Sequence, residues 1–415
     1  MKFAGYQCST CAEQYGPDRT IYVCLKDGGN LDVLLEVGGI RKQSSLKQIR
    51  SSSEGSMWRY LPLLPVDDPG YPNSALRVVG WTPLLRAERL GAELGLNELW
   101  LKDDGRNPTA SFKDRASAVV VARAREIGAE TVVTASTGNA GAALAGMAAA
   151  AGLPAVILAP RTAPKAKVAQ LLIFGARVLL VEGSYDEAFD LTLEAAEAFG
   201  WYCRNTGYNP FTAEGKKTAA FEICEQLTPA GSKSSWAVPD ALFVSVGDGN
   251  ILSGLHKGFK DLLELGWIER LPRLYGVQSS GSAAVANAFR AGSSTIEPVK
   301  ANTLADSIAV DLPRDGIRAL RAARETGGAV FTVEDEAILS AIQALGREAV
   351  FAEPAGAASY AGVVKAVADG LVGSEEQIVA VITGSGLKDV PAAMRAAGEA
   401  MVIEPTLPAL RAALG

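Results

Sequence analysis

Short runs of β-branched and aliphatic residues alternate with Ala-rich helical patterns along most of this chain, and this alternation constrains the fold more than any other feature. The expected strands cover residues 99–102, 131–135, 155–158, 177–181, 241–246, 274–278 and 378–382. The expected helices lie near residues 114–127, 139–151, 165–174, 185–199, 214–227, 251–265, 335–347 and 356–369. Strands separated by helices form parallel βαβ units, whose sheets are covered on both faces. The pattern predicts the α/β class, in a chain of 415 residues that is long enough for two cores or one large core split by a cleft.

The first 40 residues differ from this pattern and predict a small separate module. Cys8 and Cys11 form a C-x-x-C turn, and Cys24 begins a second turn in which Asp27 occupies the fourth position. Two such turns separated by a short hairpin are typical of zinc ribbons, in which four thiolates hold zinc tetrahedrally. Because one thiolate is replaced by a carboxylate, residues 1–40 are interpreted as a degenerate zinc-ribbon-like module. Zinc bound by these four side chains is one hypothesis, and a ribbon relic held by packing without metal is the favoured one.

Composition excludes several kinds of function. The formal net charge of −6 gives no general attraction to nucleic acid or to anionic membranes. The single histidine, His256, excludes a two-histidine zinc site, and its helical surroundings predict an ordinary helix residue. Any acid–base chemistry must therefore depend on other groups.

The start of the chain lacks the features of a signal peptide, and its most apolar windows are broken by glycine and proline. The five cysteines are an odd set, which fits reduced thiols better than a disulfide framework. We therefore expect a soluble cytoplasmic protein with no nucleic-acid or membrane partner. Residues 41–56 are polar, Ser-rich and basic, and predict a linker or surface loop.

A lysine stands where an expected strand gives way to a helix, in the segment 107–115 (NPTASFKDR). Asn and Pro end the strand, and Thr109 or Ser111 is expected to cap the helix that follows. A positive helix end and a sheltered cleft would both lower the pKa of Lys113 and favour the neutral amine, which is the nucleophile that forms imines. The alternative is a surface lysine at a helix start, paired with Asp114.

Two further strand ends run into small-residue turns that open helices. At residues 134–141 (TASTGNAG), backbone N–H groups and hydroxyls converge at a helix N-terminus, which suits a carboxylate. The alternative there is a plain helix cap with tight packing at Gly141. At residues 245–250 (SVGDGN), glycines let the backbone approach a phosphate. Because Asp248 would repel that phosphate, its binding is assigned mainly to backbone N–H groups.

The last strand end is followed by Thr383 and a glycine turn. A threonine hydroxyl there would face a flat heteroaromatic ring, and a neutral hydroxyl would not keep a pyridine nitrogen protonated as a carboxylate does. This favours elimination and replacement chemistry. Together the four segments supply an imine-forming lysine, a carboxylate cradle, a phosphate cradle and a ring partner. That set predicts an enzyme that uses pyridoxal 5'-phosphate (PLP) on a small amino acid.

The sequence resembles the fold-type-II (tryptophan synthase β-like) PLP enzymes and, within them, the threonine synthases. The segment 107–115 is specific to this branch, and the likeness extends from about Gly80 to Asp389. It includes residues 136–139 (STGN), 167–170 (KVAQ), 208–210 (YNP), 214–218 (EGKKT), 353–357 (EPAGA) and 383–388 (TGSGLK). The resemblance implies two open α/β domains, a large one of residues 57–110 and 231–415 and a small one of residues 111–230, in a homodimer.

The resemblance also implies a role for each matching residue. Lys113 would bind PLP through a Schiff base and later move protons, Asn139 would hydrogen-bond the cofactor's ring oxygen, and Thr383 would face the pyridine nitrogen. The implied cofactor-binding residues are Lys113, Asn139, Gly247, Asp248, Gly249, Asn250 and Thr383. The implied substrate-binding residues are Ser136, Thr137, Gly138, Asn139, Lys167 and Asn209. The implied reaction is that of a carbon–oxygen lyase that converts O-phosphohomoserine and water to L-threonine and phosphate.

The sequence departs from the family pattern where a phosphorylated substrate would be held. Thr212 and the segment 309–313 (AVDLP) stand where these enzymes have arginines, and Ser385 stands where histidine is common. Phosphate recognition depends on cations, and the candidates to compensate are Arg161, Lys167, Arg314 and Arg318.

Two alternatives remain beside the threonine synthase interpretation. The first is another fold-type-II enzyme, such as a serine/threonine dehydratase or a β-replacement enzyme, because residues 303–310 (TLADSIAV) are similar to a dehydratase loop. The second is a PLP-binding protein without turnover that acts as a regulator or scaffold.

Overall fold

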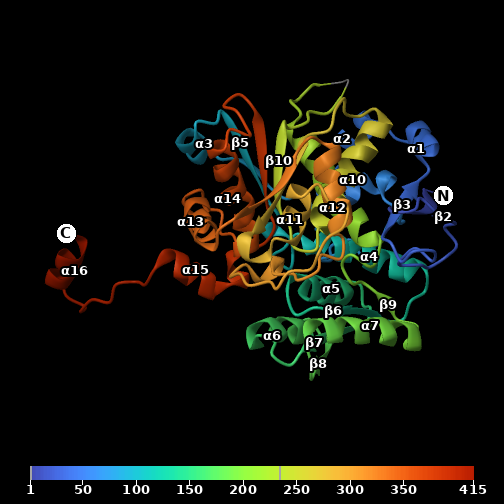
Figure 1. Ribbon diagram of the computed structural model, residues 1–415, viewed down its shortest axis with the longest axis horizontal. Helices are drawn as coiled ribbons and strands as arrows, with labels where there is room; N and C mark the ends of the chain where they lie inside the picture. Colours follow the sequence, from blue (N-terminus) through green and yellow to red (C-terminus); the bar gives the residue numbers. More distant parts are fainter. Residues whose placement is uncertain (1, 233–234) are drawn as a thin grey trace.

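The computed structural model describes residues 2–232 and 235–415 and contains three sheets (Figure 1). The smallest is an antiparallel sheet of order β2-β1-β3 near the N-terminus. Its strands are β1 (Phe3–Cys8), β2 (Gln14–Tyr15) and β3 (Leu31–Leu35). Figure 1 shows these strands on the side of the molecule opposite the C-terminal helix α16 (Leu407–Leu414), which projects away from the body.

The largest sheet has six strands in the order β12-β11-β10-β13-β5-β4. Its strands are β4 (Leu84–Arg86), β5 (Glu98–Asp103), β10 (Ala241–Ser245), β11 (Arg273–Ser279), β12 (Ala329–Val333) and β13 (Gln377–Ile382). All pairs are parallel except β4 with β5. Its helices are α3 (Glu88–Leu94), α10 (Asn250–Leu265), α11 (Ala284–Arg290), α12 (Gly316–Glu325), α13 (Asp335–Arg347), α14 (Pro354–Ala368) and α15 (Val390–Ala397). Every residue of β10 is buried, as expected for a strand covered on both faces.

The third sheet is parallel and has the order β8-β7-β6-β9. Its strands are β6 (Val132–Ala135), β7 (Ala155–Pro160), β8 (Arg177–Val181) and β9 (Tyr202–Cys203). The accompanying helices are α4 (Lys113–Glu126), α5 (Asn139–Ala150), α6 (Lys165–Ile173), α7 (Tyr185–Phe199), α8 (Phe211–Lys216) and α9 (Thr218–Leu227). Helix α4 packs on α5 and α8, and α8 packs in turn on α10, so these helices join the two parallel sheets.

The structure confirms the α/β class and the expected strands and helices to within a few residues. The prediction of a loop at residues 41–56 was wrong, because α1 (Val37–Gln43) and α2 (Leu46–Arg50) occupy much of it. The Ser45 hydroxyl caps α2 by accepting from the Gln48 backbone N–H, and Ile49 is buried in the core. Among the described residues, no helix is both long and apolar enough to cross a bilayer.

A cluster of fully buried charges fixes the start of α4. Arg115 donates to Asp104 (Nε–Oδ2, 2.6 Å), which follows β5, and to Glu222 on α9 (Nη2–Oε2, 2.8 Å). Glu222 also pairs with Lys102 of β5 (2.7 Å) and accepts from the backbone N–H of Trp81 (2.7 Å). Burial acts to raise the pKa of Glu222, but Arg115 and Lys102 lower it to about 2. The first turn of α4 is therefore held by ionised groups from β5 and α9.

Replacing one member of this cluster should destabilise the protein strongly. In Glu222→Gln, two buried cations would share only the carboxylate of Asp104. Breaking a buried ion pair on one side typically costs about 3–5 kcal/mol. Urea denaturation should therefore show a loss of about 3 kcal/mol in the free energy of unfolding. The control is Glu182→Gln, where a carboxylate that is 75% exposed pairs with Arg161 and where the loss should stay below about 1 kcal/mol. Equal losses in the two variants would contradict this account of the cluster.

Candidate active site

A cleft of about 660 Å³ lies where α4, α5 and α10 begin. It is lined by ends of strands from both parallel sheets, by the loop at residues 306–312 and by the start of α7. The predicted site residues on its wall are Lys113, Ser136, Thr137, Gly138, Asn139, Lys167, Gly247, Asp248, Gly249, Asn250 and Thr383. Residues far apart in the sequence are thus brought to one cavity at the carboxyl ends of parallel strands, which is the usual place for ligands in such sheets.

Lys113 is positioned by a direct connection between two of the predicted segments. The backbone N–H of Phe112 donates to the carbonyl of Thr383 (2.8 Å), and that of Ser385 donates to the carbonyl of Ala110 (3.1 Å). Ala110 has a φ of +62°, in the left-handed region that lets the chain turn before α4. The lysine is therefore held beside the turn that follows β13.

The predicted cap of α4 was wrong. The residue before the helix is Phe112, without a side-chain cap. The backbone N–H of Thr109 instead donates to the carboxylate of Asp114 (2.6 Å), and the Thr109 hydroxyl bonds to the same carboxylate. Asp114 is thus occupied by Thr109, so the alternative in which it pairs with Lys113 does not apply.

The surroundings of the lysine amine shift its protonation equilibrium toward the neutral form. Burial lowers the pKa of Lys113 below its ordinary value, Arg204 lowers it further, and Glu353 and Asp248 act in the opposite direction. No hydrogen bond or ion pair holds its Nζ among residues 2–232 and 235–415. A neutral amine without a partner is free to act as a nucleophile or a base.

The N-terminus of α10 forms one anion cradle. The backbone N–H groups of residues 247–250 have no hydrogen-bond partner within the described parts of the chain, so they remain available to a ligand. The side chain of Asn250 is already used: it donates to Asp315 (2.6 Å) and accepts from Lys216. Asp248 also lines the cleft, and burial raises the pKa of its carboxyl group. Any contribution of this turn to phosphate binding therefore comes from its backbone, as the sequence suggested.

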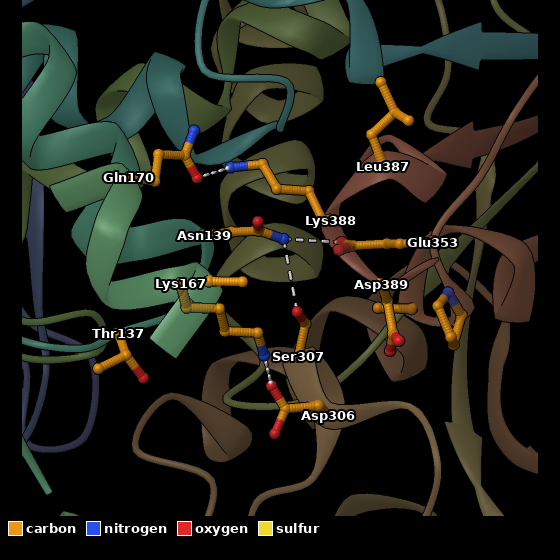
Figure 2. Close-up of a pocket in the computed structure, with 14 residues that line it drawn as sticks. Thr137, Asn139, Lys167, Gln170, Asp306, Ser307, Glu353, Leu387, Lys388 and Asp389 are labelled. Atoms are coloured by element: carbon orange, nitrogen blue, oxygen red, sulfur yellow. Dashed lines mark hydrogen bonds and ion pairs between the residues drawn. The ribbon is translucent and has the colours of Figure 1, made fainter. Parts of the chain in front are cut away.

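The N-terminus of α5 also opens into the cleft, and Figure 2 shows the pocket beside it. Asn139 begins the helix, and its Nδ2 donates to Glu353 (2.7 Å) and to Ser307 (3.4 Å). A methyl group on Gly141 would lie 1.9 Å from the carbonyl oxygen of Ser136, so only glycine permits this tight turn. Burial raises the pKa of Glu353, while its hydrogen bond from Asn139 and the nearby Lys113 lower it.

Lys216 and Glu353 lie in two of the segments that match the family, 214–218 and 353–357, but no role in the site was predicted for either residue. Lys216 is fully buried on α8 and lines the cleft, and burial together with Lys113 holds its pKa well below the ordinary value. The adjacent Lys217 is fully buried as well, so the sequence pair gave no signal of which lysine lines the cleft. Glu353 immediately precedes the proline that opens α14. Gly384 leaves room for it, since a methyl group there would lie 2.3 Å from Glu353 Oε1.

Asn209 and His256 lie away from the cleft wall. Asn209 is 1% exposed, and its side chain donates to the carbonyl of Cys203 (2.7 Å) and accepts from the N–H of Phe211 (2.9 Å). It shapes the turn before α8 instead of lining the cavity. His256 is buried on α10 with Nε2 3.2 Å from Glu325, and burial lowers its pKa to about 4. It is the ordinary helix residue that the sequence predicted.

Two of the four cations suggested for phosphate binding lie at the cleft. Lys167 pairs with Asp306, and Arg314 pairs with Asp186 (3.2 Å). The other two are engaged elsewhere: Arg161 pairs with the exposed Glu182, and Arg318 is buried against Asp315 and Asp32. Lys167 and Arg314 therefore bring positive charge to the cleft, and each can exchange its present carboxylate partner for an anionic ligand.

The family of this chain follows from comparison with known proteins. The family described as "Pyridoxal-phosphate dependent enzyme" matches residues 75–384. A solved structure of the processed form of threonine deaminase isoform 2 from Solanum lycopersicum has a TM-score of 0.64 and 26% identity, covering 76% of this chain and 83% of that one. The fold and the cleft thus define a fold-type-II PLP-dependent enzyme.

Similarity to curated proteins identifies a family within this class of PLP-dependent enzymes. Threonine synthase from Methanocaldococcus jannaschii is 40% identical over 401 residues, which is 96% of each chain. Threonine synthase from Methanosarcina acetivorans is 37% identical over 411 residues, or 98% of each. That from Synechocystis is 36% identical over 88% of this chain and 92% of its own. The chain belongs to the threonine synthase family.

The residues of the cleft fit PLP. The cofactor carries an aldehyde, a phosphate and a pyridine ring. The cavity offers an amine with a lowered pKa, a helix N-terminus whose N–H groups have no partner among the described residues, and the hydroxyl of Thr383 on its wall. Lys113 therefore suits the aldehyde of PLP, residues 247–250 suit its phosphate, and Thr383 suits its pyridine ring.

The pKa of Lys113 can be tested through its reactivity. Only the neutral amine attacks an aldehyde, so a lowered pKa moves half-maximal reactivity to a pH below the ordinary lysine value of 10.5. The rate at which cofactor-free protein reacts with pyridoxal should show this shift, after subtraction of the residual rate of Lys113→Ala. Because Glu353 raises the pKa of Lys113, Glu353→Gln should move the midpoint lower still. A midpoint at or above 10.5, or a move upward in Glu353→Gln, would contradict the assignment.

Proposed function

We propose that this chain converts O-phosphohomoserine and water to L-threonine and phosphate. In this reaction Cβ loses a proton, the Cγ–O bond breaks with release of phosphate, a hydroxyl group from water is added at Cβ, and a proton is added at Cγ. The similarity to threonine synthases over almost the whole chain carries the proposal. The cleft supports it, because it joins an amine that can move protons to two helix N-termini and exchangeable cations.

PLP, when bound, withdraws electrons from the substrate and so stabilises negative charge next to the amino group. The chain's own residues bind and move protons. We propose that the N–H groups at the start of α10 hold the cofactor phosphate and that Thr383 faces the ring nitrogen. Lys113 is assigned to hold the cofactor and then to take up and return protons at the substrate carbons, for which a lowered pKa is suited.

The substrate's two anionic groups would then bind on either side of Lys113. We assign the carboxylate to the start of α5, at Ser136, Thr137, Gly138 and Asn139. The substrate phosphate is assigned to Lys167 and Arg314, which would exchange their present carboxylate partners for it. In this assignment, these two side chains replace the arginines that the family has at Thr212 and in the segment 309–313.

The division into domains is part of the proposal. We propose a small domain of residues 111–230, a large domain of residues 57–110 and 231–415, and the module of residues 1–40. It is supported by the sheets, since all strands of each sheet fall within one of these three units.

We also propose that the protein is a homodimer in the cytoplasm. The segment after α15, residues 398–415, projects from the body and exposes large apolar side chains. Met401 is 72% exposed, Val402 94% and Leu414 79%. Such a surface is typical of an interface, and a second copy of the chain would cover it. All five cysteines are free thiols, which fits a reducing compartment. Sedimentation velocity of the full chain would show a monomer if the dimer proposal were wrong.

The substrate proposal predicts a specific effect on the Michaelis constant. The purified yellow enzyme should release phosphate and threonine from O-phosphohomoserine, and should form little 2-oxo acid from serine or threonine. A hydrogen bond to a charged group contributes about 1.5–3 kcal/mol. Lys167→Ala and Arg314→Ala should therefore each raise KM for O-phosphohomoserine by about 10- to 100-fold, with a smaller change in kcat.

Arg161→Ala is the matched control, because Arg161 is exposed and lies off the cleft wall. Its KM should equal that of the unmodified enzyme. Rapid formation of a 2-oxo acid and ammonia from serine or threonine, without phosphate release from O-phosphohomoserine, would instead identify a dehydratase.

A further inference from the structure

Four side chains outside the cleft converge on one point in the N-terminal module. Cys8 ends β1, Cys11 lies in the following turn, and Cys24 and Asp27 lie in the turn before β3. One ligand atom from each lies within 4.8 Å of those of the other three. Cys11 Sγ and Cys24 Sγ are 3.6 Å apart, and Cys8 Sγ and Asp27 Oδ1 are 3.4 Å apart. Tetrahedral zinc with ordinary bonds to sulfur and oxygen separates its ligand atoms by about 3.4–3.8 Å.

The backbone around these side chains is arranged to support negative charge. The N–H groups of Thr10 (3.3 Å) and Cys11 (3.4 Å) both point at Cys8 Sγ. In the second turn, the N–H of Lys26 points at Cys24 Sγ (3.4 Å) and that of Gly29 donates to Asp27 Oδ1 (2.9 Å). Hydrogen bonds of this kind orient metal ligands and stabilise their anionic forms. The two turns are thus built alike, although one ends in a carboxylate.

We propose that Cys8, Cys11, Cys24 and Asp27 bind one zinc ion as a closed structural site. Three thiolates and one carboxylate oxygen fill the four tetrahedral positions, so none remains for a substrate. Binding releases the thiol protons and forms three Zn–S bonds and one Zn–O bond. This reverses the favoured hypothesis of a ribbon relic without metal, because all four ligand atoms lie within 4.8 Å of one another and two of the pairs already have the spacing of zinc ligands.

The site is connected to the wall of the cleft. Three residues beyond Asp27, the side chain of Asn30 donates to the backbone carbonyls of Gly207 (2.6 Å) and Arg314 (3.1 Å). Arg314 lines the cleft. Arg318 ties the next strand, β3, to the same region by bonding to Asp32 (2.8 Å) and to Asp315. Zinc would fix the turn that leads to Asn30, and the hydrogen bonds of Asn30 would then hold the backbone of Arg314 in place at the cleft wall. This last step depends on the proposed role of Arg314 in substrate binding.

The metal content of the full-length holoenzyme tests the site directly. Protein produced with added zinc and then dialysed should contain one zinc per chain by elemental analysis. Replacing zinc with cobalt(II) should give the visible bands of a tetrahedral ion and near-ultraviolet thiolate bands. The control Cys224→Ala alters a buried thiol of the central core and should keep the full zinc content. Zinc far below one per chain, with all thiols free to react with a thiol reagent, would overturn the proposal.

Two substitutions at Asp27 separate ligation from folding. Asp27→Cys restores a fourth thiolate, so it should retain one zinc and release it to a chelator more slowly than the unmodified chain. Asp27→Ala removes a ligand and should release zinc at least tenfold faster. Equal release rates in all three proteins would overturn the role of Asp27. These readouts do not involve the reaction, so they stand even if the chain proves to act on another substrate.

The connection to the cleft has its own test. In Asp27→Ala stripped of zinc, KM for O-phosphohomoserine should rise several-fold while the absorbance of bound PLP is retained. Asn30→Ala should raise KM similarly without loss of zinc. An unchanged KM in both proteins would overturn the connection and leave the metal site itself standing.

Discussion

The buried charges around Arg115 are the constraint on which the site depends. This arginine lies two residues after Lys113 on the first turn of α4, and its partners are Asp104, which follows β5, and Glu222 on α9. Moving the helix start would leave several ions unpaired in a region without solvent, which is strongly unfavourable. The cluster therefore fixes the position of Lys113, and the loop bonds from Phe112 and Ser385 set its place next to Thr383. Rigid support of this kind is what a catalytic group requires.

The electrostatics of the cleft follow from that placement. Burial and Arg204 lower the pKa of Lys113, and burial together with Lys113 lowers the pKa of Lys216. Cations and two helix N-termini thus surround one cavity, and the acidic side chains of Asp248 and Glu353 offset part of its positive charge. Such a cavity favours a ligand with several anionic groups and an aldehyde. The same residues that make the cofactor fit also suit a doubly anionic substrate.

Much of the fold could be predicted from the sequence because its signals are local. Alternating strand and helix patterns and glycine turns at strand ends identified the α/β class and most of the cleft wall. What could not be predicted depends on contacts between distant segments. Thr109 bonds to Asp114 instead of capping the helix, and Asn209 turns away from the cleft. Lys216 faces Asn250 across 34 positions of sequence, which no local pattern reveals. Part of the loop predicted at residues 41–56 is helical, and Ile49 of that part packs in the core against residues far along the chain.

The most direct test of the central claim is to locate the covalent link between chain and cofactor. The yellow holoenzyme should be reduced with borohydride, digested and examined by mass spectrometry. The account predicts one phosphopyridoxyl group on the peptide that contains Lys113, with its loss in Lys113→Ala. Modification of the peptide that contains Lys216 instead, a fully buried lysine that also lines the cleft, would contradict the account.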